Sequence, residues 1–247
     1  MSDKIKIYKN CLLDLDETLL DFHASEKIGL EKVLRAKGLS FSEEIYAAFK
    51  VYNKSLWKEL EKGTICREEL FTKRFAYIFG ECEGDSSDLD PLAVNHEFIN
   101  TMSQNGVLLD GALEFVKRIK EEIKDLKIYV ITNGATVNAR GRIASTGLDR
   151  FLDDVFISED MGVTKPSIEY FDMVLDKIKQ PKESCIVIGD SLTSDMLGAK
   201  NASMVSIWFK PEGDIESAVK EYGIDYTADS YDEIINALKE WDKKHSF

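Results

Sequence analysis

Two aspartates stand two residues apart, at positions 14 and 16, directly after an apolar run that ends at Leu13. Side chains at i and i+2 of an extended segment point to the same side, so the spacing predicts that both carboxylates face one site. One carboxylate could then attack a substrate or hold a metal ion, while the other transfers a proton. The same pair is, by itself, equally typical of a loop with helix-capping aspartates.

Three further polar motifs follow later apolar runs. Thr132-Asn133-Gly134 combines a hydroxyl, an amide and a turn whose backbone N–H groups can hold phosphate oxygens. Lys165 places a single cation next to Pro166, and Asp190 and Asp195 stand five residues apart where an apolar run meets a helical pattern. Each motif alone is typical of a turn, a surface lysine or a first-turn acid of a helix. Their common place after apolar runs indicates one shared site.

The elements that must position these motifs form an α/β pattern. Apolar runs alternate with stretches of helical period, which is typical of βαβ units around a parallel sheet. The predicted strands are Tyr8–Leu13, Lys127–Thr132, Asp154–Ser158, Ser184–Gly189 and Met204–Phe209. The predicted helices are Val137–Thr146, Ser167–Ile178 and Ser194–Asn201, with Pro166 suited to a first helical position. Open parallel sheets bind ligands at the carboxyl ends of their strands, where the motifs fall.

The interval from about Phe22 to Gln104 differs, because it shows successive helical patterns and no convincing strand. A polar, acidic stretch from Glu81 to Asp90 predicts a loop between two of these helices. We therefore expect a Rossmann-like, doubly wound α/β core at residues 1–20 and 105–247. An all-helical domain at residues 21–104 would interrupt this core after its first strand.

The composition is that of an acidic globular protein, with 44% hydrophobic and 31% charged residues. Its 45 acidic and 32 basic residues give a net charge of −13, which would repel nucleic acid and anionic membranes. The four cysteines have no zinc-ligand spacing, and we find neither a signal peptide nor an 18-residue apolar run. These features predict a soluble, cytoplasmic protein in a reducing compartment.

The four motifs, in this order and around a helical insertion, resemble those of the haloacid dehalogenase superfamily of phosphohydrolases. They are Asp14-Leu15-Asp16-Glu17-Thr18, Thr132-Asn133, Lys165-Pro166 and the segment from Gly189 to Asp195. The insertion resembles the cap domain of that superfamily. A second set resembles the branch of house-cleaning pyrimidine 5′-nucleotidases: Leu56-Trp57, Gly63, Arg67, Arg74-Phe75 and Ile188 to Asp195.

The resemblance implies hydrolysis of a phosphate monoester in two steps. Asp14 would attack phosphorus to give an aspartyl phosphate. Asp16 would protonate the leaving group and then accept a proton from the attacking water. Thr132, Lys165 and the N–H groups of Asn133 would hold the phosphoryl oxygens.

The resemblance also implies a Mg²⁺ ion, because a hard cation lets several carboxylates and a phosphate share one site. Its ligands would be Asp14, Asp190 and the backbone carbonyl of Asp16. Asp195 would orient the metal-bound waters or pair with Lys165.

The substrate would be a small phosphorylated metabolite chosen by the helical domain, with pyrimidine nucleoside or deoxynucleoside monophosphates as the first expectation. Among the aromatic and basic residues of this domain, Arg74 is the preferred substrate contact. Phe71, Arg74 and Phe75 also lie at helical spacing, which is typical of packing between helices. The alternatives are a sugar-phosphate phosphatase, a phosphosugar mutase of the same fold or a non-enzymatic phospho-acceptor signalling domain.

Overall fold

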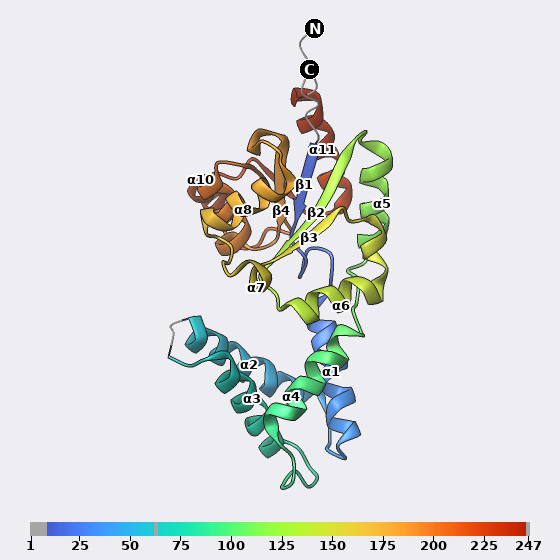
Figure 1. The fold of residues 1–247 in the computed structure, drawn as a ribbon, viewed down its shortest axis with the longest axis vertical. Coiled ribbons are helices and arrows are strands. Elements are labelled where there is room, and N and C mark those ends of the chain that lie inside the picture. Colours follow the sequence, from blue (N-terminus) through green and yellow to red (C-terminus); the bar gives the residue numbers. More distant parts are fainter. Residues whose placement is uncertain (1–8, 62–63, 246–247) are drawn as a thin grey trace. The chain divides into compact units, whose positions relative to one another are not determined.

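The structure is a computed structural model that describes residues 9–61 and 64–245 and divides into two compact units (Figure 1). Unit 1 consists of Met1–Phe22 and Val107–Phe247, and unit 2 of His23–Gly106. The boundaries predicted from the sequence lie two residues from these at both crossings between the units. The interruption of the core comes shortly after its first strand.

Unit 1 is built on a six-stranded sheet with the order β3-β2-β1-β4-β5-β6, in which every pair of neighbours is parallel. The strands are β1 (Lys9–Leu13), β2 (Leu126–Thr132), β3 (Asp154–Ile157), β4 (Cys185–Gly189), β5 (Val205–Phe209) and β6 (Tyr226–Ala228). Every residue of β4 is buried, as expected for a central strand that is covered on both faces. The doubly wound α/β core predicted from the sequence is confirmed.

Helices cover both faces of this sheet (Figure 1). One face packs Leu13 of β1 with residues of α5 (Ala112–Glu122), α6 (Thr136–Thr146) and α11 (Tyr231–His245). The other face packs Leu12 with α8 (Ile168–Ile178) and α9 (Leu197–Ala202). The remaining helical elements are η1 (Leu148–Phe151), α7 (Ser158–Met161), η2 (Lys182–Ser184), η3 (Leu192–Met196) and α10 (Ile215–Tyr222). Adjacent residues of β1 thus belong to different cores because strand side chains alternate.

The predicted strands agree with the described ones to within one residue at each end, and Tyr8 lies outside the described residues. Two predictions at helix starts were wrong. Pro166 is not a first helical residue, because Ser167 caps α8 by accepting a hydrogen bond from Glu169 N, and the Lys165–Pro166 bond is cis. The segment predicted as Ser194–Asn201 begins as the π-helix η3 and becomes α-helical only at Leu197.

Among the described residues of unit 2, all regular secondary structure is α-helical. Its helices are α1 (Phe22–Ala36), which begins at the boundary, α2 (Glu43–Glu61), α3 (Arg67–Glu81) and α4 (Pro91–Ser103). The rings of Phe49, Phe75 and Phe98 meet in its core with centroids 5.5 to 6.1 Å apart. The predicted loop before Pro91 ends at Asp90, whose side chain caps α4 by accepting from Leu92 N.

Across both units, none of the described helices combines the length and the apolar character needed to cross a membrane. The four cysteines are free thiols, and Cys11 and Cys185 are buried in the core of unit 1.

Candidate active site

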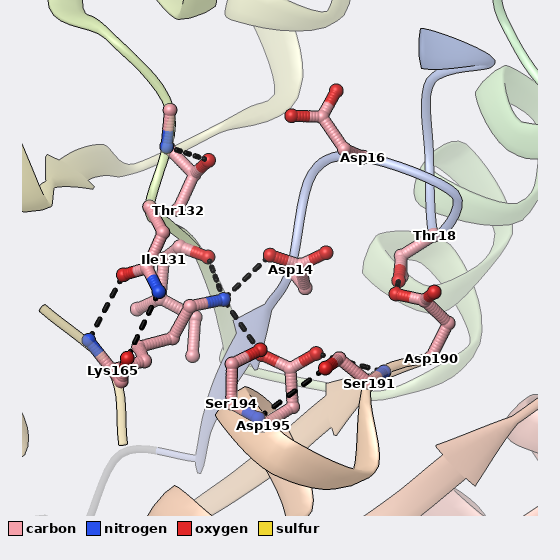
Figure 2. Close-up of polar contacts among 12 residues, drawn as sticks. Asp14, Asp16, Thr18, Ile131, Thr132, Lys165, Asp190, Ser191, Ser194 and Asp195 are labelled. Carbon is pink, nitrogen blue, oxygen red and sulfur yellow. Dashed lines mark hydrogen bonds and ion pairs between the residues drawn. The ribbon is translucent and has the colours of Figure 1, made fainter. Parts of the chain in front are cut away.

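The predicted site residues of unit 1 meet at the carboxyl ends of neighbouring strands (Figure 2). Asp14 directly follows β1, Thr132 ends β2, and Asp190 directly follows β4. The strands β2, β1 and β4 are adjacent and parallel, so their carboxyl ends share one edge of the sheet. Asp14 N donates to the carbonyl of Ile188 at 2.8 Å, which continues the pairing of β1 with β4 up to the aspartate.

Lys165 contacts two of the aspartates, Asp14 and Asp195. Its Nζ donates to Oδ1 of Asp14 and to Oδ1 of Asp195, both at 2.6 Å, and to the carbonyl of Ile131 at 2.9 Å. Burial by itself lowers the pKa of Lys165, but the charges of Asp14 and Asp195 raise it above its usual range. Lys165 therefore stays an ammonium group at neutral pH.

Asn133 fixes the backbone of Lys165. Its Oδ1 accepts from Lys165 N and its Nδ2 donates to the Lys165 carbonyl, both at 2.9 Å. The sequence predicts Asn133 only as a substrate contact through its N–H group, and this second role of its side chain was missed. The two residues in contact are 32 positions apart, so no local sequence pattern indicates that they pair.

Thr132 is 1% exposed, and its hydroxyl accepts a hydrogen bond from Gly134 N at 3.0 Å. This contact closes the turn that follows β2 (Figure 2).

The acidic groups form a cluster that fits a divalent cation. Asp14, Asp190 and Asp195 each offer an oxygen, and these atoms lie within 4.8 Å of one another. Burial raises the pKa of Asp14, and Asp195 raises it further. Burial and then Asp195 raise the pKa of Asp190 to about 6. Three carboxylates balanced by one lysine leave excess negative charge, and their oxygens are the ligands that Mg²⁺ prefers.

Asp195 is the completely buried member of this cluster. Oδ1 accepts from Lys165 and Oδ2 from the backbone of Ser191 at 3.2 Å, so both oxygens have protein partners. The predicted pairing of Asp195 with Lys165 is observed.

The carboxylate of Asp16 is not part of this cluster and lies apart from that of Asp14 in Figure 2. It lies near the turn after β2, because a Cβ atom built on Gly134 would be 3.9 Å from Asp16 Oδ2. That both carboxylates face one substrate stays a prediction. The Asp16 carboxylate binds Arg142 of α6, at 2.5 and 3.1 Å. Sequence reasoning missed Arg142, although an arginine one position before Ile143 and three after Ala139 stands on the apolar face of its helix.

Arg74, the predicted substrate contact of unit 2, is 5% exposed and lies inside that unit. It donates to Oδ1 of Asn95 at 2.7 Å and to Oδ1 of Asn53 at 3.2 Å. Burial lowers the pKa of Arg74 to about 10, against the opposing charge of Glu26. These contacts agree with the interpretation that Phe71, Arg74 and Phe75 pack between helices. A contact of Arg74 with the substrate stays a prediction. Gly63 lies outside the described residues.

A sequence profile of the haloacid dehalogenase-like hydrolases matches residues 8–203, and thus more than half of the chain. The chain belongs to this family. Among its relatives is the pyrimidine 5′-nucleotidase PynA of Streptococcus pneumoniae, 36% identical over 83% of this chain and 84% of that protein. The pyrimidine 5′-nucleotidase YjjG of Escherichia coli is 31% identical over 81% of this chain and 88% of its own.

A solved structure shows the same fold. The HAD-hydrolase YfnB of Bacillus subtilis, in a magnesium-bound crystal form, superposes with a TM-score of 0.80 and 28% identity, covering 94% of this chain and 99% of that one. In the present haloacid dehalogenase-like hydrolase, the strand-end carboxylate, the buried ammonium group and the acidic cluster all belong to unit 1. Together they can supply a nucleophile and balance the charge of a phosphoryl group.

Proposed function

We propose that this phosphohydrolase cleaves phosphate monoesters through an aspartyl phosphate on Asp14. The observation that carries the proposal is the placement of Asp14, which contacts the Lys165 ammonium group and lies beside Asp190 at the carboxyl edge of the sheet. A carboxylate at this edge faces the position where open α/β sheets bind their ligands.

In the first step, an Asp14 oxygen forms a bond to phosphorus while the bond from phosphorus to the ester oxygen breaks. The electron pair leaves with the ester oxygen, which takes a proton from Asp16. In the second step, water attacks the phosphorus of the aspartyl phosphate and gives a proton to Asp16. Asp14 is released as a carboxylate together with inorganic phosphate, so Asp16 returns to its protonated form.

Lys165 and the turn after β2 bind the phosphoryl oxygens in this proposal. The Lys165 ammonium group, the Thr132 hydroxyl and the N–H groups of the turn at Asn133 balance the charge of these oxygens during transfer. The side chain of Asn133 supports this arrangement by fixing the Lys165 backbone.

The donor set fits Mg²⁺, with Asp14, Asp190 and the backbone carbonyl of Asp16 as the residues that would hold it. When bound, the ion neutralises the phosphoryl oxygens and lets the carboxylates share the site with a dianion. Asp195 would hold Lys165 in place and orient waters around the ion.

For the substrate, we propose a pyrimidine nucleoside or deoxynucleoside monophosphate, with unit 2 as the cap that selects it. The names of PynA and YjjG, together with their identity over most of the chain, support this choice. Trp57 of unit 2 is 37% exposed and offers a ring for stacking on a base, and Arg74 is retained as a candidate contact.

A panel of phosphate esters tests the proposal. Phosphate release is measured from uridine, deoxyuridine and thymidine monophosphates, from glucose 6-phosphate, and from glyceraldehyde 3-phosphate, each with Mg²⁺ and with EDTA. We expect Mg²⁺-dependent release with the highest kcat/KM for a pyrimidine nucleotide. A wide preference for a sugar phosphate would overturn the substrate assignment alone, whereas no release from any ester would overturn the proposed reaction.

A further inference from the structure

Arg142 binds both oxygens of the Asp16 carboxylate with the two ends of its guanidinium group. Nη1 donates to Oδ1 at 2.5 Å and Nη2 donates to Oδ2 at 3.1 Å. Arg142 is 0% exposed, whereas the side chain of Asp16 is 28% exposed. A planar, two-point contact fixes the direction of a carboxylate, which a single point charge does not.

The stability of the fold does not account for an arginine at this position. Among the described residues, Nε of Arg142 has no hydrogen-bond partner although it is buried. The neighbours Ala139 and Ile143 on the same helix face are apolar and buried, and the Phe22 ring lies 5.3 Å from the guanidinium carbon. A buried guanidinium group with one donor unsatisfied costs free energy that an apolar side chain would not, so this arrangement points to a role beyond packing.

The direction of the Asp16 side chain suits one step of the reaction. In an in-line displacement at phosphorus, the attacking and the leaving oxygens lie on opposite sides of the phosphorus atom. A group that protonates the leaving oxygen must therefore stand away from the nucleophile. Figure 2 shows the Asp16 carboxyl group pointing away from Asp14 and from the Lys165 ammonium group.

We infer that Arg142 is a positioning residue, which holds the carboxyl group of Asp16 on the leaving-group side of the site. The inference rests on the proposed function, in which Asp14 attacks and Asp16 transfers the proton. It makes Arg142 act through Asp16 and not on the substrate. Replacing Arg142 should then lower kcat/KM most for esters whose leaving group must be protonated.

The test compares two esters whose leaving groups differ in their need for protonation. A nucleoside monophosphate releases an alkoxide, whereas p-nitrophenyl phosphate releases a phenolate that is stable without a proton. For both esters kcat/KM reports the steps up to formation of the aspartyl phosphate. We expect Arg142→Gln to lower kcat/KM for the nucleotide by about 100-fold and for p-nitrophenyl phosphate by less than about 3-fold, in line with the usual size of general acid catalysis.

Two further variants separate positioning from folding. Arg142→Lys keeps the charge without the two-point contact and should lose about 10-fold on the nucleotide, a partial rescue. Arg140→Gln removes an exposed arginine of the same helix that pairs with Asp160 at 3.0 Å, and should leave both esters unchanged. If Arg142→Gln does not fold, as judged by thermal melting, the comparison of the two esters is made with Arg142→Lys.

The decisive control is Asp16→Asn. In that background, Arg142→Gln should cause no further loss on the nucleotide, because the group through which it acts is gone. Equal losses of kcat/KM on both esters, or a loss in the Asp16→Asn background as large as in wild type, would overturn the role of Arg142. The proposed function would still stand if the wild type hydrolyses the esters. A wild-type protein that hydrolyses neither ester would overturn both.

Discussion

Gly189 and Asp195 occupy the same space, in that a Cβ atom built on the glycine would overlap the aspartate side chain from Cβ to Oδ2. The last residue of β4 must therefore lack a side chain for the buried Asp195 carboxylate to take its place in the acidic cluster. Gly189→Ala should displace Asp195 from Lys165 and lower the free energy of unfolding by about 2 to 4 kcal/mol, measured by urea denaturation.

Gly80→Ala is the matched control for this substitution. Gly80 lies in α3, and a Cβ atom there would meet nothing within 4 Å. Alanine should stabilise that helix by about 0.5 to 1 kcal/mol. Equal effects at the two glycines would contradict the overlap argument.

Lys165→Met should strongly destabilise the protein at neutral pH. The substitution leaves Asp14 and Asp195 without their shared ammonium group in a buried site, which costs about 3 to 5 kcal/mol in free energy of unfolding. Lys177→Met, at an exposed position of α8, should change the same quantity by less than about 0.5 kcal/mol. A Lys165 variant as stable as the Lys177 variant would show that the three groups are not coupled as described.

Without metal, the protein should become less stable as the pH rises from 3.8 to about 6, because burial raises the pKa of Asp190 over that interval. The folded state binds more protons than the unfolded state there, so unfolding becomes easier with increasing pH. In EDTA, Asp190→Asn should lack this contribution. Between pH 3.8 and about 6, its free energy of unfolding should rise relative to that of wild type by roughly 1 to 2 kcal/mol. Mg²⁺ should reduce the difference, since it binds the ionised carboxylate. Parallel stability curves in EDTA would refute the shift.

Arg74→Met should lower the free energy of unfolding by about 2 to 4 kcal/mol. It removes the hydrogen bonds to Asn95 and Asn53 and the positive charge that faces Glu26, which is 2% exposed. Lys73→Met, at an exposed neighbouring position of α3, serves as the control and should have almost no effect. Unchanged stability of the Arg74 variant would argue against its place in the core of unit 2.

The sequence predicts the strands well because the central strands are buried on both faces and read as continuous apolar runs. Each run ends where a polar motif begins, and this also places Asp14, Thr132 and Asp190 at one edge of the sheet. The three-residue strand β6 was missed, because a short strand at the edge of a sheet carries little pattern.

Contacts between distant segments account for the features that could not be predicted. The direction of Asp16 depends on Arg142, which is 126 residues away in the sequence. The side-chain role of Asn133 depends on the loop at Lys165. Such pairs have no fixed spacing, and the one local signal for Arg142 is a charged residue on an apolar helix face.

The role of Asp14 as the nucleophile is tested most directly by phosphate release from deoxyuridine monophosphate in the presence of Mg²⁺, with wild type and Asp14→Asn compared side by side. The amide keeps the shape of the side chain but cannot attack phosphorus. Wild type should release phosphate from this ester. The rate of phosphate release by Asp14→Asn should be lower by at least about 1000-fold, although the variant remains folded. Activity of Asp14→Asn within a few fold of wild type would contradict the account.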